Sequence, residues 1–98
     1  MQTLTSAQRK KLRGLAHHLE PTVWLGQQGV TDAWLASVDK ALLDHELIKI
    51  KFVDHKDEKS ELVDEIISKT KAHHAGTVGN VAILYRENPD EDKRKIEL

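Results

Sequence analysis

The chain has 98 residues, with 15 Lys and Arg against 16 Asp and Glu, a formal net charge of -1, 39% hydrophobic residues and no cysteine. These values predict one folded domain over residues 1–98 and exclude a disordered or fibrous chain. The lack of cysteine excludes a disulfide framework and a thiolate metal site, and without a membrane-length apolar run or a signal-peptide pattern we expect a cytoplasmic protein that binds no membrane.

The first predicted element is a helix over about residues 6–18, which ends before Pro21. Thr5 and Gln8 have the spacing of a capping box, and apolar residues recur at helical spacing: Leu12, Leu15, Ala16 and Leu19. No acid precedes Glu20, and a basic row follows one side of this helix: Arg9, Arg13 and His17, with Lys10 beside them. Such a row is either a solvated face or an anion-binding one, and the missing acids favour the second.

The stretch from Val23 to Thr31 predicts a strand, a glycine turn and the start of a helix. A buried strand is predicted for the apolar residues Val23, Trp24 and Leu25. Gly26 and Gly29 frame a turn, and Thr31 is a usual N-cap. Backbone amides at such a turn and helix N-terminus can contact a phosphate directly, although glycine here can also serve turn geometry alone.

A second helix is predicted over about residues 32–44, and a strand over residues 47–53. The inward face of the helix should hold Trp34, Leu35, Val38, Ala41 and Leu42. We assign Trp34 to the core rather than to base stacking. In the strand, Lys49 and Lys51 alternate with apolar residues, so one face is core and the other cationic. These lysines either contact a ligand or protect an edge strand from pairing.

A third helix is predicted from about Lys59 to His73, followed by a strand from Val78 to Arg86. The second G-x-x-G, Gly76 to Gly79, is interpreted as a helix C-cap and turn. Residues 93–98 form either a short edge strand or a basic tail. The order α-β-α-β-α-β(-β) predicts an α/β domain with a mixed β-sheet of three to four strands and three helices.

No pattern in the chain predicts catalysis, a cofactor or a small-molecule substrate. Two histidine pairs, at residues 17–18 and 73–74, suggest metal binding, but neighbours on a helix lie about 100° apart and cannot share one ion. No nucleotide-binding or nucleophile motif occurs. We therefore expect a binding protein that is not an enzyme, and a hydrolase that uses a histidine is the least supported alternative.

Several segments together resemble the CRM domain family, named for chloroplast RNA splicing and ribosome maturation, whose stand-alone bacterial members are the YhbY-like proteins. The resemblance covers a core of about residues 4–86 and lies in residues 10–17, Pro21, and residues 25–31, 45–51, 78–79 and 84–86. It implies an RNA-binding fold similar to the C-terminal domain of translation initiation factor three, with a GxxG loop likened to that of KH domains. It also implies association with precursors of the large ribosomal subunit and their ribosomal RNA.

The resemblance also implies where RNA binds. The loop falls on Gly26, Gln27, Gln28 and Gly29, and the basic surface, with Arg9 added from the helix row, on Lys10, Lys11, Arg13, Lys49, Lys51 and Arg86. Many members have a basic residue in the loop where this chain has two glutamines, so affinity is expected to depend more on loop amides and the first helix. The alternative function is a protein-binding adaptor that uses sheet augmentation.

Overall fold

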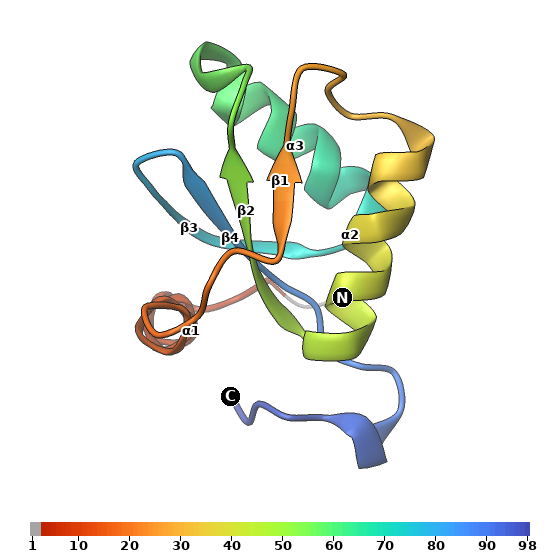
Figure 1. The fold of residues 1–98 in the computed structure, drawn as a ribbon. Helices are drawn as coiled ribbons and strands as arrows, with labels where there is room; N and C mark the ends of the chain where they lie inside the picture. Colours follow the sequence, from red (N-terminus) through yellow and green to blue (C-terminus); the bar gives the residue numbers. More distant parts are fainter. Residues whose placement is uncertain (1–2) are drawn as a thin grey trace.

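The computed structural model describes residues 3–98 as a four-stranded sheet with helices on both faces (Figure 1). The helices are α1 (Ser6–Ala16), α2 (Asp32–His45) and α3 (Lys59–Thr70). The strands are β1 (Val23–Leu25), β2 (Leu47–Phe52), β3 (His73–Val78) and β4 (Val81–Tyr85), and the short 3-10 turns are η1 (Lys56–Glu58) and η2 (Glu91–Lys93). None of the helices in this part of the chain combines the length and apolarity needed to cross a membrane.

The sheet is mixed, with the strand order β1-β2-β4-β3. β1 and β2 are parallel, and α2 forms the crossover between them. β4 pairs antiparallel with β2 on one side and with β3 on the other. The predicted fold class, a single α/β domain with a mixed sheet and three helices, is confirmed.

Alternate strand residues supply two separate hydrophobic cores because successive side chains point to opposite faces of a sheet. The larger core lies under α2 and α3 and includes Ile48, Ile50 and Phe52 of β2. It also contains residues of the predicted inward face of α2, with Val38 and Leu42 buried and Trp34 and Ala41 packed against them. The smaller core lies under α1 and contains Leu12, Ala16, Leu47, Ala75, Ile83 and Tyr85.

The third helix is shorter than predicted, and the segment after it is a strand. α3 ends at Thr70, where Lys71 adopts a left-handed φ of 59°. Residues 73–78, predicted as a helix end and a turn, instead form the edge strand β3. A bulge between His74 and Gly76 breaks the alternation of β3, which removes the sequence signal of a strand. Gly79, with a φ of 59°, lies in the short turn to β4.

The fourth strand is therefore β3 and not the C-terminal segment. Residues 94–98 form no strand, but Ile96 packs against the smaller core. The buried carboxylate of Glu46 accepts backbone N–H bonds from Asn88, Lys95 and Ile96. The segment is thus held by a side chain in place of strand pairing.

Candidate nucleic-acid interface

The glycine loop that follows β1 is a tight turn with two exposed glutamines at its tip. The N–H of Gly29 donates to the carbonyl oxygen of Gly26 at 3.1 Å, and Gly29 has a φ of 73° that favours glycine. Within residues 3–98 the backbone amides of Gln27 and Gln28 donate to no acceptor. These two amides are therefore free to donate to an anion that approaches the tip.

Residues distant in sequence hold the loop in place. The ring Nε2 of His55 lies 3.0 Å from the carbonyl oxygen of Gln27. The N–H groups of Val53 and Asp54 donate to the carbonyl oxygen of Leu25, at 3.0 and 3.2 Å. His55 is not among the predicted site residues, because nothing in the charged turn around it indicates that it meets the glycine loop. These contacts limit the movement of the loop before any ligand arrives.

The N-terminus of α2 contributes less to this site than the sequence suggests. The side chain of Thr31 caps the helix by accepting the N–H of Trp34 at 3.1 Å, as the N-cap prediction requires. The first turn also carries Asp32, whose negative carboxylate partly neutralises the positive end of the helix dipole. An anion at the loop would therefore depend mainly on the turn amides.

Some basic residues of α1 donate side-chain hydrogen bonds within residues 3–98, and one does not. Arg13 donates from Nη1 to the carbonyl oxygen of Ala75 at 3.0 Å, and Arg9 donates to that of Leu4 at 3.3 Å. The Nζ of Lys11 donates to the carbonyl oxygen of Glu97 in the C-terminal segment, so Lys11 lies on the other flank of α1 from Arg13. Lys10 is exposed, and at 100° per residue it lies on the same flank as Arg13.

The two lysines of β2 lie on the α1 side of the sheet. Lys51 is exposed, whereas Lys49 is half-buried and donates from Nζ to the carbonyl oxygen of Leu19 at 2.8 Å. β2 pairs with β1 on one side and β4 on the other, so these lysines do not protect a sheet edge. The same pairing leaves β2 with no free edge for sheet augmentation.

Arg86 lies apart from the loop, in a bridge between α2 and α3. Its guanidinium pairs with the carboxylate of Asp39 and donates to the carbonyl oxygens of Asp39 and Thr70, at 3.0 and 2.9 Å. Its side chain is only 17% exposed. The structure does not bring this predicted contact together with Gly26–Gly29.

Trp24 differs most from its prediction, because it is 54% exposed where a buried residue was expected. The residues on either side, Val23 and Leu25, point into the larger core. Since side chains alternate along a strand, Trp24 faces the opposite side of the sheet. There it lies beside Lys51, its register partner on β2.

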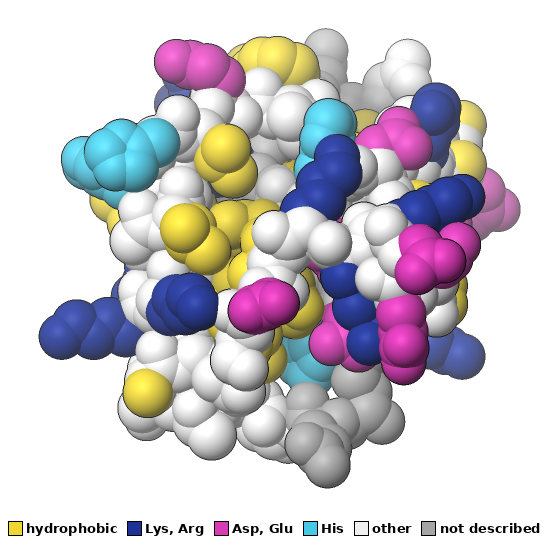
Figure 2. All heavy atoms as spheres, turned by 90° about the horizontal axis from the view of Figure 1, so that it is seen from below, with side chains coloured by type: hydrophobic (Ala, Val, Ile, Leu, Met, Phe, Trp, Pro, Cys, Tyr) yellow, Lys and Arg dark blue, Asp and Glu magenta, His cyan; other side chains and the backbone are white. Residues whose placement is uncertain are grey.

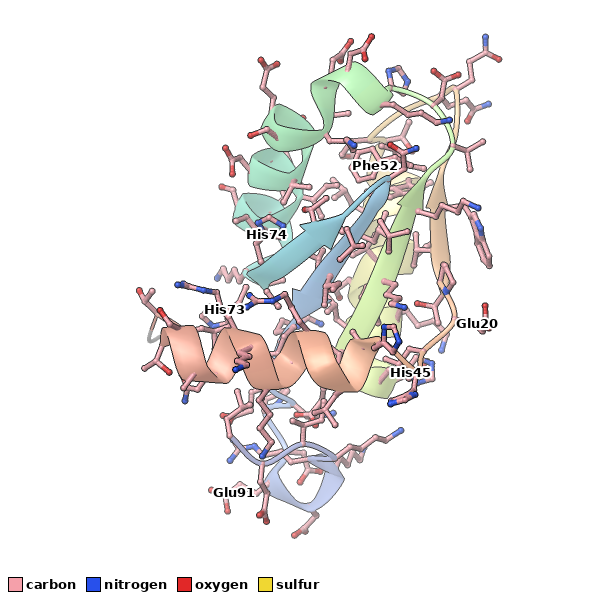
Figure 3. The ribbon with its side chains drawn as sticks, turned by 90° about the vertical axis from the view of Figure 1, so that its left-hand side faces the viewer. Glu20, His45, Phe52, His73, His74 and Glu91 are labelled. Atoms are coloured by element: carbon pink, nitrogen blue, oxygen red, sulfur yellow. The ribbon has the colours of Figure 1, made fainter. Side chains whose placement is uncertain are left out.

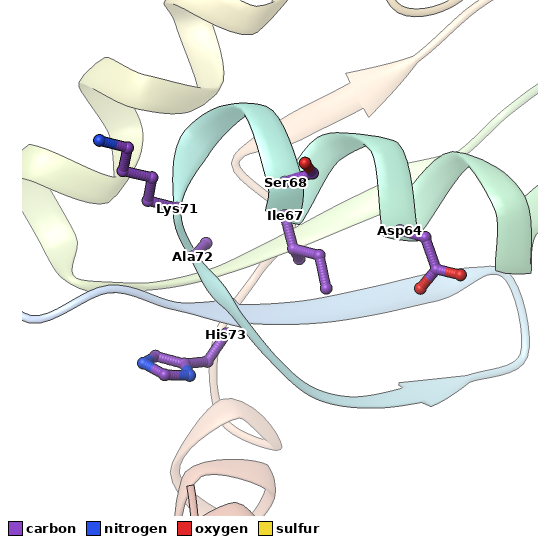
Figure 4. A pocket seen from close by; sticks show the side chains of 6 residues that line it. All are labelled: Asp64, Ile67, Ser68, Lys71, Ala72 and His73. Atoms are coloured by element: carbon purple, nitrogen blue, oxygen red, sulfur yellow. The ribbon is translucent and has the colours of Figure 1, made fainter. Parts of the chain in front are cut away.

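Several hollows in residues 3–98 lie away from the loop, and two of them have a lining that bears on function. The first, about 510 Å³, lies between the end of α3 and β3 (Figure 4), and is lined by Asp64, Ile67, Ser68, Lys71, Ala72 and His73. Burial lowers the pKa of His73, but within residues 3–98 no hydrogen bond joins any two of Asp64, Ser68 and His73. The hollow therefore contains no assembled nucleophile and base.

The second hollow, about 470 Å³, lies between the end of α1, the start of β2 and the C-terminal segment. Leu15, Leu19, Leu47 and Ile96 are among its lining residues. Seen from below, this end of the molecule shows hydrophobic side chains in the middle with both acidic and basic groups around them (Figure 2). Mixed charge of this kind does not favour a polyanion.

Residues 4–86 match the model of the CRS1 / YhbY (CRM) domain. An RNA-binding protein of Haemophilus influenzae is 42% identical over 99 residues, covering 100% of this chain and 97% of the relative. A probable RNA-binding protein of Pseudomonas aeruginosa is 35% identical over 91 residues, covering 92% and 88%. The solution structure of a hypothetical protein of Staphylococcus aureus, a candidate RNA-binding protein, has a TM-score of 0.80 at 27% identity and covers 97% of this chain and 100% of its own.

Proposed function

The chain belongs to the CRS1 / YhbY (CRM) domain family, and on that premise we propose that it binds RNA without catalysis and assists assembly of the large ribosomal subunit. The observation that carries the proposal is the glycine loop with two free amides at its tip. The names of the relatives, which are RNA-binding proteins, support RNA as the partner. Large-subunit ribosomal RNA is the partner that the resemblance to YhbY-like proteins implies.

In the proposed complex the loop holds the RNA backbone, and exposed lysines of α1 and β2 add charge. Gly26 and Gly29 carry no side chains, so a phosphate can approach the amides of Gln27 and Gln28 closely. Lys10 and Lys51 are exposed and donate to no acceptor within the described residues, so their ammonium groups can contact further phosphates. Contacts of this kind bind many sequences alike and weaken as salt rises.

A single carboxylate at the loop tip tests this site. Gln28→Glu should lower RNA affinity about tenfold, or about 1.4 kcal/mol, because the charge repels an approaching phosphate. Its melting temperature should stay unchanged because Gln28 is exposed. Gln28→Ala is the matched control and should bind nearly as the parent does, since the amides remain. Equal binding by all three proteins, measured by fluorescence anisotropy, would make the turn purely structural.

The ribosomal part of the proposal needs a separate experiment in cell extract. Cross-linking in extract, followed by sequencing of the attached RNA, should concentrate reads in large-subunit ribosomal RNA. The Gln28→Glu variant should lose those reads while its expression holds. Reads scattered over messenger RNAs would contradict the assembly role and leave RNA binding intact.

A further inference from the structure

One row of side chains crosses all four strands on the α1 side of the sheet. Trp24 of β1 is paired in register with Lys51 of β2, Lys51 with Val81 of β4, and Val81 with Val78 of β3. Residues paired in register share a face, so these four side chains form one continuous row. We call it the open row.

The open row lies beyond the part of this face that α1 covers. Leu12 and Ala16 of α1 pack over the other end of the strands, and Figure 3 shows the helix across that end, with the strands continuing above it. Trp24 is 54% exposed and Val78 67% exposed, and Lys51 is exposed as well. No helix in residues 3–98 covers the row.

The order of residues in the row fits a nucleotide better than a protein surface. Both faces of an unpaired base are apolar and aromatic, and bases stack on indole rings with little regard to sequence. The phosphate joined to such a base needs a cation close by, and Lys51 is on the neighbouring strand, about 5 Å away. A purely apolar partner would instead leave the ammonium group of Lys51 desolvated at the centre of the row.

The row is also continuous with the glycine loop. Trp24 precedes Gly26 by two residues, and its carbonyl oxygen accepts the indole N–H of Trp34 at 2.9 Å, which fixes the backbone of β1. A strand of RNA held at the loop tip therefore reaches the open row within a few nucleotides. We propose that an unpaired nucleobase stacks on Trp24 while its phosphate contacts Lys51. This inference rests on the proposed RNA-binding function and adds that the bound segment is single-stranded.

Tryptophan fluorescence can report stacking directly because the chain has only two tryptophans. In Trp34→Phe, Trp24 is the only tryptophan and can be excited selectively over Tyr85, and circular dichroism checks that the variant is folded. Oligo(U) should quench this emission as it binds, whereas a blunt duplex RNA of equal length should bind without quenching. Anisotropy measured on labelled RNA confirms binding in each case. Binding of oligo(U) with unchanged emission would overturn the proposal.

Affinity gives an independent test. Trp24→Ala should weaken binding of oligo(U) about tenfold, and Trp24→Phe should keep most of the affinity because its ring still stacks. Neither variant should change the salt dependence, since stacking releases no counterions. Both should fold, because the side chain lies outside the two cores.

The outcomes separate this inference from the function on which it rests. If Trp24→Ala binds RNA like the parent while Gln28→Glu does not, the stacking site is wrong and the loop site stands. If the parent binds neither RNA, both fail. If Trp24→Ala loses a protein partner but no RNA affinity, the open row is a protein interface and the inference is overturned.

Discussion

Glu46, at the junction of α2 and β2, shows how one buried carboxylate can replace strand pairing. It is 1% exposed and has a φ of 63°, and a positive φ is uncommon outside glycine. Its oxygens accept the N–H groups of Asn88 at 2.7 Å and Ile96 at 3.2 Å, as well as that of Lys95. Burying a charge is costly unless hydrogen bonds compensate it, and these amides supply that compensation.

Glu46→Gln should therefore destabilise the domain. The amide keeps one acceptor oxygen but turns an NH₂ group toward backbone donors, so at least one buried N–H loses its partner. We expect a loss of about 1–3 kcal/mol and a melting temperature lower by roughly 5 °C or more. Glu20→Gln makes the same chemical change at an exposed site and should melt like the parent. Equal melting of the two variants would show that these bonds contribute no net stability.

At the scale of elements, the C-terminal segment should stabilise the fold although it is not a strand. Truncation after Asn88 removes the N–H groups of Lys95 and Ile96 from Glu46 and uncovers part of the smaller core. We expect a melting temperature lower by several degrees. In the truncated protein Glu46→Gln should cost much less than in the full chain, because the two changes remove the same bonds. Strictly additive losses would contradict the proposed coupling.

The elements with regular periodicity were predictable, and those fixed by long-range pairing were not. β2 alternates core residues with Lys49 and Lys51, and α1 begins with the predicted capping box of Thr5 and Gln8. β3 escaped prediction because its bulge interrupts the alternation and because β4 alone holds it. Glycine is needed at position 76 because of a contact outside β3: a Cβ there would lie 2.6 Å from Cδ of Arg13 in α1.

The candidate site also has parts that local sequence predicts and parts that depend on long-range packing. Local sequence predicts the turn at Gly26–Gly29, because glycine spacing and the N-cap at Thr31 are local features. The exposure of Trp24 depends on how far α1 extends over the sheet. The position of the Arg86 side chain depends on its partners in α2 and α3. Neither can be obtained from residue spacing, which is why an apolar trio was expected to be wholly buried.

At the scale of the whole molecule, the net charge of -1 hides a separation of charge between the two sides of the sheet. On the α2 and α3 side, three cations are paired with acids: Lys40 with Asp44, Lys69 with Glu65, and Arg86 with Asp39. Lys59 and Lys71 on that side form no ion pair within residues 3–98. Within residues 3–98 no ion pair involves a basic residue of α1 or β2. A polyanion on the α1 side of the sheet therefore meets basic residues that no ion pair compensates, whereas most of the α2 and α3 cations named above already face an acid.

This separation predicts how salt affects RNA binding. The double variant Lys10→Gln/Lys51→Gln removes two exposed cations from the α1 side. Its affinity should fall for all RNAs alike. The slope of log affinity against log salt should flatten by about 0.7 for each lost phosphate contact with single-stranded RNA. The measurement is a titration of labelled RNA at several salt concentrations, with circular dichroism as a check on folding.

Lys40→Gln is the matched control, because it removes one positive charge from the α2 side, where the lysine already faces Asp44 at 2.9 Å. Exposed pairs of this kind contribute little to stability, so the control should fold and melt like the parent. It should also keep the parental salt slope, since no phosphate is expected on that side. If the control flattens the slope as much per charge as the Lys10 and Lys51 changes do, RNA responds only to the total charge, and the α1 side is not the interface.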